Sequence, residues 1–163
     1  MVESIDAQTM LGQNYEPNRP FRFLLGIDGV DAFLVKTSGR PGVTTDEIEI
    51  GFINNTRYVA GKTKPNTIAI TLIDAIDPST SQKVMEWVRL HYDAATGRAA
   101  YQNFYKKDIT LKMLGPVGDV VSAWDIYGAF ITEATPSELD YTSGGDVATW
   151  SIVLRYDRAV LQF

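Results

Sequence analysis

The sequence lacks cysteine altogether and contains a single histidine, His91. Disulfides and thiolate metal sites are therefore excluded, and one imidazole cannot form a multi-histidine metal centre. No apolar run approaches the ~20 residues of a membrane-spanning helix, and the first residues show no basic region followed by an apolar stretch. We expect no secretion signal, no membrane insertion, and synthesis in a reducing, intracellular compartment.

Signatures of catalysis are missing as well. There is no Gly-x-Ser-x-Gly motif, and the glycines at 26 and 29 are not followed by the lysine of a phosphate-binding loop. Asp125 and Glu133 are the nearest candidates for a carboxylate pair, but eight residues along one strand would separate them by about 26 Å, which is too far for one site. The sequence predicts a protein that is not an enzyme and has no catalytic, cofactor-binding or metal-binding residues.

What the chain does have is the composition of one folded domain. Its 163 residues are 45% hydrophobic and 21% charged, which is ordinary for a globular protein and sufficient for one core. Residues 1–20 are polar, contain two prolines and show no apolar periodicity. We expect an extended N-terminal arm over residues 1–20 and a single β domain over residues 21–163.

Alternation of apolar and polar residues dominates the rest of the sequence. A period of two indicates strands with one buried and one exposed face, and it recurs at 21–27, 30–37, 47–53, 66–74, 108–114, 120–134 and 147–157. Many strands and a single helical segment predict a mainly β fold of two packed antiparallel sheets, a sandwich or barrel, with one flanking helix. Gly128, inside the longest run, indicates a bulge or bend.

Two connections between these strands carry distinct signals. The dipeptide Asp28-Gly29 predicts a tight hairpin between the first two strands. The segment 54–65 is polar and locally basic, and at about twelve residues it is longer than a hairpin turn requires. We expect it to be a loop between the third and fourth strands. Ile48, Ile50 and Phe52 should then form the buried face of the third strand.

The helical segment begins after a recognisable cap. Ser79 and Gln82 have the spacing of a capping box, and apolar residues then recur at helical spacing. We expect Val84, Trp87 and Val88 to form a core-facing stripe that packs on the sheets.

The order of these features resembles the tail tube proteins of contractile bacteriophages and the related tube proteins of contractile injection systems. The resemblance covers roughly Phe21 to Tyr156. Its series comprises the first hairpin, the Pro41-Gly42 corner, Ile48-Glu49-Ile50, the basic loop, Ile68-Ala69-Ile70-Thr71-Leu72, the helix around Trp87, Asp108-Ile109-Thr110-Leu111, Trp124-Asp125-Ile126-Tyr127-Gly128-Ala129-Phe130, and Gly144-Gly145 before Trp150 to Tyr156.

The resemblance implies a structural role in a virion. Family members form homohexameric rings that stack, as a helical assembly, into a hollow tube that conducts DNA from capsid to host during ejection. The implied partners are copies of the chain itself, the tail sheath, the baseplate and the terminator, with DNA as a cargo bound without sequence specificity. The implied location is the virion tail, assembled in the host cytoplasm.

Three alternatives stay open at this point. The chain could be the inner tube of a contractile injection system that delivers protein effectors. It could be a ring that initiates or terminates a tube. A carbohydrate-binding β-sandwich, with Tyr101, Tyr105 and Trp124 stacking on sugar rings, is a third reading.

Two sets of residues are expected to act in assembly. The loop at 54–65 resembles the inter-ring loop of the family, so Arg57, Tyr58, Lys62 and Lys64 are predicted to contact an adjacent ring; the alternative is a mobile surface loop. The second set concerns charge. The net charge of −5 arises entirely after residue 115, because residues 116–163 hold 7 acids and 2 bases. An acidic wall would not hold DNA by counterion release, so at least some of these acids are predicted to face the lumen, rather than the outer surface or subunit seams: Asp119, Asp125, Glu133, Glu138, Asp140 and Asp146.

Overall fold

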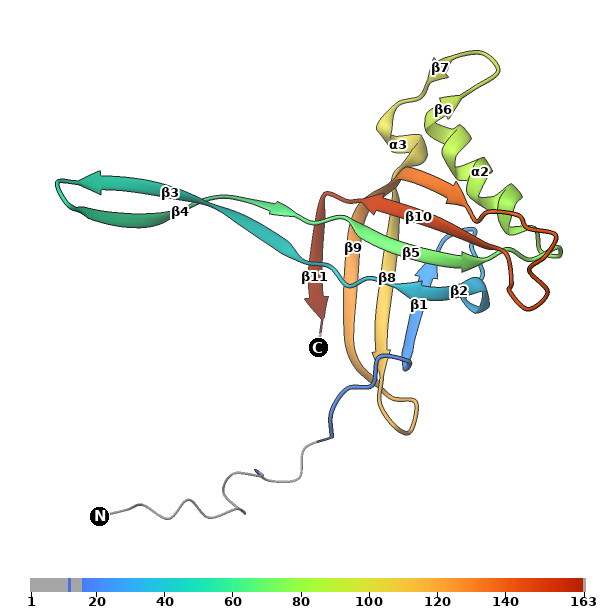
Figure 1. The fold of residues 1–163 in the computed structure, drawn as a ribbon, viewed down its shortest axis with the longest axis horizontal. Coiled ribbons are helices and arrows are strands. Elements are labelled where there is room, and N and C mark those ends of the chain that lie inside the picture. Colours follow the sequence, from blue (N-terminus) through green and yellow to red (C-terminus); the bar gives the residue numbers. More distant parts are fainter. Residues whose placement is uncertain (1–11, 13–15, 163) are drawn as a thin grey trace.

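The computed structural model describes residue 12 and residues 16–162, so most of the expected N-terminal arm lies outside the described residues. In chain order the elements are β1 (Phe23–Ile27), the 3-10 turn η1 (Ala32–Leu34), β2 (Val35–Ser38), β3 (Val43–Phe52), β4 (Asn55–Pro65), β5 (Ile68–Ile73), α2 (Thr80–His91), β6 (Tyr92–Asp93), β7 (Arg98–Ala99), α3 (Gln102–Tyr105), β8 (Lys107–Leu114), β9 (Val120–Pro136), β10 (Thr149–Arg155) and β11 (Arg158–Gln162). Figure 1 shows their arrangement.

Two antiparallel sheets share the long strand β9. Its first half pairs with β8 and β11, and β1 completes this group, which we call sheet A. Its second half, residues 130–136, pairs with β10, and β5 and β2 follow outward in what we call sheet B. The strands of sheet B cross those of sheet A (Figure 1). The expected mainly β fold of packed antiparallel sheets is confirmed, and the sheet is not closed into a barrel because β1 and β2, at its two ends, do not pair.

The bend that allows β9 to change sheets lies at Gly128. This residue has a φ of 68°, and its N–H leaves the ladder to donate to Asp108 Oδ1 at 3.1 Å. At the preceding residue, the carbonyl of Tyr127 accepts a hydrogen bond from Asp157 N–H at 3.0 Å. Such a backbone conformation suits glycine because it has no Cβ. The bend that the sequence indicates at Gly128 is therefore present.

Replacing Gly128 by alanine should destabilise the fold by about 1–3 kcal/mol, the range for a residue held in a disfavoured backbone region. A Cβ at this position would lie 2.9 Å from Cγ of Asp157. Urea denaturation followed by circular dichroism measures the change. Gly51→Ala is the matched control, since a Cβ on that strand residue meets nothing within 4 Å. Equal stability of both variants would contradict the role of the bend.

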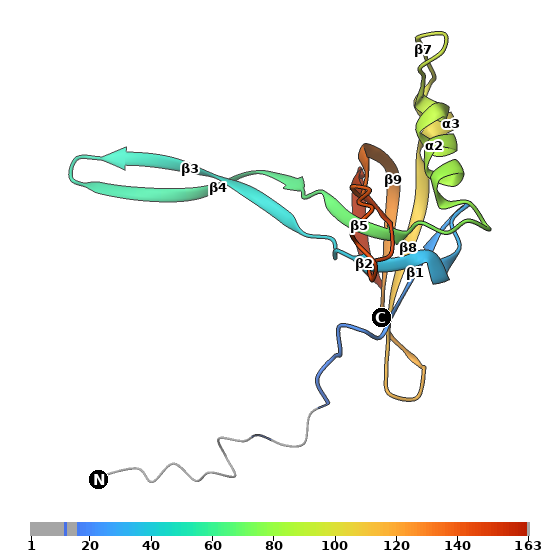
Figure 2. The same cartoon turned by 45° about the vertical axis from the view of Figure 1, so that its right-hand side comes forward.

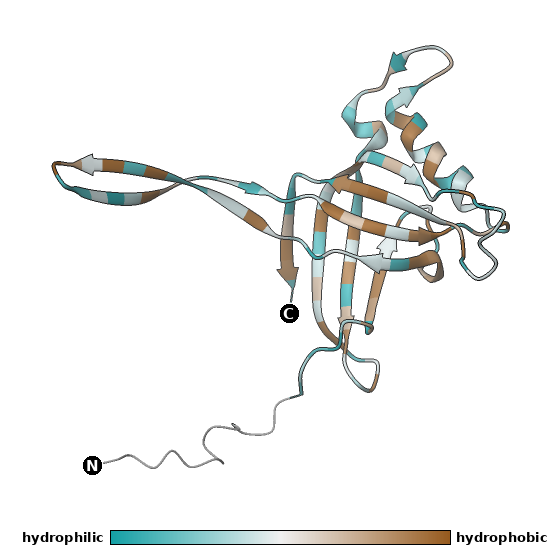
Figure 3. Cartoon of the chain, viewed as in Figure 1, coloured by the Kyte–Doolittle hydropathy of each residue, from teal (hydrophilic) through white to brown (hydrophobic). Residues whose placement is uncertain are grey.

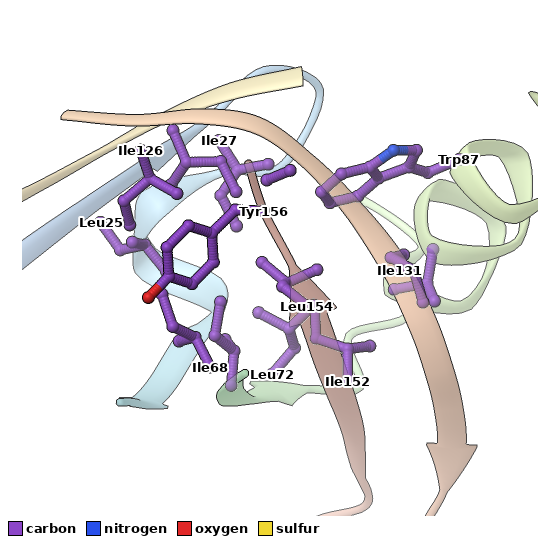
Figure 4. Close-up of a cluster of buried hydrophobic side chains, with 14 of the residues drawn as sticks. Leu25, Ile27, Ile68, Leu72, Trp87, Ile126, Ile131, Ile152, Leu154 and Tyr156 are labelled. Carbon is purple, nitrogen blue, oxygen red and sulfur yellow. The ribbon is translucent and has the colours of Figure 1, made fainter. Parts of the chain in front are cut away.

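The core fills the space between the sheets and extends under α2 (Figure 4). Ser79 Oγ accepts a hydrogen bond from Gln82 N at 3.3 Å, so the helix begins where the capping signal places it. Val84 and Trp87 are buried, and Val88 packs against the core from a partly buried position. Trp87 Nε1 also donates to the carbonyl of Tyr105 at 2.8 Å, which fastens α3, a one-turn helix that the sequence did not indicate.

The prediction of a first hairpin is wrong. The turn at Asp28-Gly29 exists, with Val30 N donating to Ile27 O at 3.1 Å. Beyond it, however, β1 joins β8 in sheet A and β2 joins β5 in sheet B. A turn signal fixes only the local reversal of the chain, whereas the partner of each strand depends on which layer buries its apolar side.

The prediction of a loop at 54–65 is also wrong. This segment is strand β4, which pairs with β3 around a two-residue turn at Ile53-Asn54. β5, the expected neighbour of β3, lies instead between β2 and β10. The threonines, Tyr58 and Val59 favour an extended strand, and this preference outweighs the polar and basic composition that suggested a loop.

Candidate assembly surfaces

The hairpin of β3 and β4 projects away from the two sheets (Figures 1 and 2). Cross-strand partners share a face, so Ile48 with Val59, Ile50 with Arg57, and Phe52 with Asn55 form one side of this ribbon. The opposite side carries Glu47 with Ala60, Glu49 with Tyr58, and Gly51 with Thr56. The first side, which we call the apolar face, accounts for hydrophobic segments of β3 in Figure 3.

The apolar face is exposed, contrary to the expectation that Ile48, Ile50 and Phe52 are buried. Ile50 is 50% exposed and Phe52 is 73% exposed. No second layer of the described chain covers this ribbon, and a two-stranded hairpin is marginal in water by itself. Contiguous exposed apolar residues on such an element are typical of an interaction surface.

The tip of the hairpin is apolar and strained. Ile53 has a φ of 54° and is 88% exposed. Sequence reasoning missed this residue. The signal that could have found it is Ile53-Asn54 itself, which lies between the alternating residues of β3 and the strand-forming Thr56, Tyr58 and Val59 of β4, with an asparagine that suits a turn.

The four predicted inter-ring residues all lie on β4, but not on one face. Arg57 is on the apolar face, and Tyr58 is on the opposite face. Lys64 forms an ion pair with Asp46 at 3.1 Å, and Lys62 lies beside the register shift near the base of the hairpin. The three bases of β4 are balanced by three acids in β3, Asp46, Glu47 and Glu49. The hairpin therefore combines an apolar face with mixed charges, and it is not basic overall.

An apolar hollow, which we call the base pocket, lies where the hairpin leaves the sheets. It is lined by Pro41, Gly42, Val43, Thr63, Pro65, Trp124, Tyr156, Asp157, Arg158 and Ala159. The Tyr156 hydroxyl donates to the carbonyl of Gly42 at 3.2 Å. Burial raises the pKa of Tyr156, so its phenol stays neutral and polar contacts at this corner stay intact at neutral pH.

The outer face of sheet B carries few charges, among them Glu133 on β9 and Arg155 at the end of β10. One cross-strand row crosses all four strands with hydroxyl side chains, Thr135, Ser151, Thr71 and Thr37 in spatial order. The adjacent row contains Glu133, Val153 and Ala69. These side chains point away from the core because the alternate residues of the same strands, such as Ile70 and Ile152, are buried.

Both edges of sheet B are free within the part of the chain that the structure describes. At one edge β2 pairs only with β5, and at the other residues 130–136 of β9 pair only with β10. Exposed backbone N–H and C=O groups at such edges favour pairing with another strand. The four strands alternate in direction, so residues 130–136 of a second copy beside β2 would continue the antiparallel order.

The six acids predicted for the lumen lie on several separate surfaces. Asp119 is in the turn between β8 and β9, Asp125 is on sheet A opposite Thr110, and Glu133 is on the outer face of sheet B. Glu138, Asp140 and Asp146 lie in the connection between β9 and β10. Hydrogen bonds from the backbone and hydroxyl of Thr142 lower the pKa of Asp140. The structure does not bring the six together.

Other chemistry is sparse in the described residues. Residues 12 and 16–162 contain no group of three His, Asp or Glu side chains arranged to hold a metal ion, and they contain no helix with the length and apolarity needed to cross a bilayer. His91 packs edge-on against Tyr105, with ring centroids 5.6 Å apart, and Tyr105 packs in the same way on Phe130. Tyr105 is thus engaged within the chain, while Trp124 lines the base pocket.

Free sheet edges and a projecting apolar hairpin are features that suit a subunit of a larger assembly. Residues 19–160 match the family model described as T4-like virus tail tube protein gp19, and the chain belongs to this family. It is a tail tube subunit of the kind found in phages and contractile injection systems. A comparison with curated protein sequences gives no match.

Several solved structures have the same fold. A chain of the sheath-tube complex of the extracellular contractile injection system PVC superposes with a TM-score of 0.72 at 21% identity, covering 97% of this chain and 99% of that chain. A chain of the anti-feeding prophage tube-terminating cap gives 0.73 at 21% identity, with 99% of each chain covered. Hcp1 from Flavobacterium johnsoniae is more distant, with a TM-score of 0.50 at 15% identity, covering 86% of this chain and 94% of that chain. The resemblance expected from the sequence is confirmed.

Proposed function

We propose that six copies of this chain close into a ring and that the rings stack into the hollow tube of a phage tail, which conducts DNA to the host during ejection. The observation that carries the proposal is the projecting β3–β4 hairpin. No described residue covers its apolar face, so a second copy that covers it would remove apolar area from water, at about 25 cal/mol per Å².

Ring closure is assigned to sheet B. Pairing of β2 with residues 130–136 of β9 in a neighbour would use the two free edges of every copy. An interface of this kind joins two different patches and repeats by rotation, so it closes into a ring when the rotation allows. Closure would also leave no exposed edge of sheet B for uncontrolled pairing.

In such a ring, the outer face of sheet B is the proposed channel wall. The hydroxyl row and its neighbouring row carry one charge, that of Glu133, and Arg155 adds one base to the same face at the end of β10. A wall with few bases offers DNA phosphates few cations to bind, so it would let the cargo slide. Of the six acids predicted for the lumen, Glu133 is on this wall; the other five lie on surfaces assigned here to rims, seams or the exterior.

The proposed setting is the tail of a virion assembled in the host cytoplasm, with sheath, baseplate and terminator proteins as neighbours of the tube. A second candidate is the inner tube of a contractile injection system with a protein cargo, which the likeness to the PVC and anti-feeding prophage chains favours. The match to the T4-like tail tube family favours the phage tail.

Electron microscopy of the purified wild-type chain tests this function. We expect sixfold rings and hollow tubes built from stacked rings. Isolated rings that never stack would identify a terminating or initiating ring instead. A monomer that forms neither rings nor tubes at any concentration tested would overturn the proposal.

A further inference from the structure

The hairpin tip holds one residue in a backbone conformation that is unfavourable for its side chain. Ile53 is the first residue of a two-residue turn, and its φ is 54°. Glycine or asparagine normally occupies such a position, because a β-branched side chain with positive φ is an outlier. Residues held in this region cost on the order of 1–3 kcal/mol and tend to occur at functional sites.

The single chain gains little in return for this conformation. Ile53 is 88% exposed, and the neighbouring Phe52 is 73% exposed. Neither side chain is part of the core cluster. We therefore infer that Phe52 and Ile53, at the end of the projecting hairpin, contact a molecule other than their own chain.

We propose that Phe52 and Ile53 of one copy insert into the base pocket of another copy. This contact rests on the function proposed above. The tip cannot fill its own pocket, because nine residue steps of about 3.3 Å separate Val43 from Phe52, a span of roughly 30 Å. The occupant of each pocket is therefore the tip of a different copy.

The pocket and the tip have complementary chemistry. Trp124, Pro41 and Pro65 give the pocket an apolar lining of the kind that accepts an aromatic and an aliphatic side chain. Its rim carries one acid and one base, Asp157 and Arg158.

The residues that flank the tip carry the same two charges. Glu49 on β3 and Arg57 on β4 lie on opposite faces of the hairpin, a few residues before and after the turn. In the contact, Arg57 would face Asp157, and Glu49 would face Arg158. Asp157 already pairs with Lys106 at 2.8 Å, and Arg158 lies over the ring of Tyr127 at 4.6 Å, so both rim charges are held in place beside the pocket.

The contact also has the symmetry that stacking needs. The tip and the pocket are different patches, and each copy offers one of each. A head-to-tail contact of this kind can repeat without closing. The edges of sheet B would then close the ring, while the tip and pocket would join successive rings.

Ile53→Gly separates this role from a role in folding. Glycine relieves the strain of positive φ and removes the apolar anchor, so the variant should be as stable as the wild type or more stable in urea denaturation. Its threshold concentration for tube formation should rise at least tenfold, while single rings persist in electron micrographs. Ile76→Gly is the matched control, because Ile76 is 98% exposed but lies in the connection between β5 and α2. It should form tubes normally.

Cross-linking tests the partner directly. The chain has no cysteine, so a disulfide between an Ile53→Cys copy and a Val43→Cys copy can come only from the engineered positions. Oxidising the mixture should give covalent dimers, whereas a mixture of Ile53→Cys with Ile76→Cys should not.

The possible failures are distinguishable. If the wild type forms tubes and Ile53→Gly forms them equally well, or if the 43–53 disulfide never forms in tubes, the tip contact is wrong and the proposed function stands. If the wild type forms no ring or tube, the proposed function fails, and the contact fails with it.

Discussion

Trp87→Ala is expected to lower the free energy of unfolding by about 3–5 kcal/mol, the range for removing a large aromatic side chain from a core. Trp87 is only 3% exposed and belongs to the core cluster between the sheets and α2. The substitution also leaves the carbonyl of Tyr105 without the indole donor, and it removes the ring beneath the Lys107 ammonium, which lies 5.1 Å from its centroid. Urea denaturation followed by far-ultraviolet circular dichroism measures the loss.

Met85→Ala is the control for the same helix, because Met85 faces solvent for much of its surface. Helix propensity changes little between methionine and alanine, so we expect a change within about 0.5 kcal/mol. A loss below 1 kcal/mol for Trp87→Ala would show that α2 does not pack on the sheets as described.

Ile50→Lys is expected to abolish tube formation while leaving the folded monomer intact. Ile50 lies in the middle of the apolar face and is 50% exposed in the single chain, so a lysine there meets water. Because Arg57 lies directly opposite, we expect the monomer to lose at most about 1 kcal/mol of stability. In the assembled tube the same position would be covered by another copy. Burying an unpaired ammonium there costs several kcal/mol per subunit, and this penalty is repeated in every ring.

Thr56→Lys provides the matched control, since it adds the same charge to the opposite face of the hairpin, beside Gly51. Sedimentation and electron microscopy of the two variants at equal concentration give the readout. Tubes from Thr56→Lys but not from Ile50→Lys would locate the interface on the apolar face. Normal tubes from Ile50→Lys would show that this face is not an interface, and failure of both variants would point to net charge as the cause.

Features that depend on neighbouring residues could be predicted from the sequence. Period-two alternation placed most of the strands, because it records which face of an extended chain avoids water. The side chain of Ser79 caps a helix whose stripe contains Val84 and Trp87, since a cap and the first turn are bonded within a few residues. Gly128 marked the bend in β9 because only a residue without Cβ suits that conformation.

The candidate site was predictable only in part. Basic composition and length drew attention to residues 57–64 as a contact segment, and the structure places them on a projecting element. Composition could not show that the acids of β3 lie across the ribbon from those bases. It also gave no sign that Ile53 would occupy the turn, because register within a hairpin depends on pairing along its whole length.

By itself the sequence determined most of the strands, the apolar stripe of α2 and the kinship with tail tube proteins. Only the tertiary structure decided which strands pair. The strands on either side of the Asp28-Gly29 turn belong to different sheets, and β3 pairs with β4 in a ribbon that no second layer of the described residues covers. The physical reason is that alternation of apolar and polar residues identifies the apolar face of a strand but carries no information about which element packs against that face. For Ile152 the cover is the opposite side of the core, whereas for Ile50 the described residues supply none, which is why we assign this face to a contact with another copy.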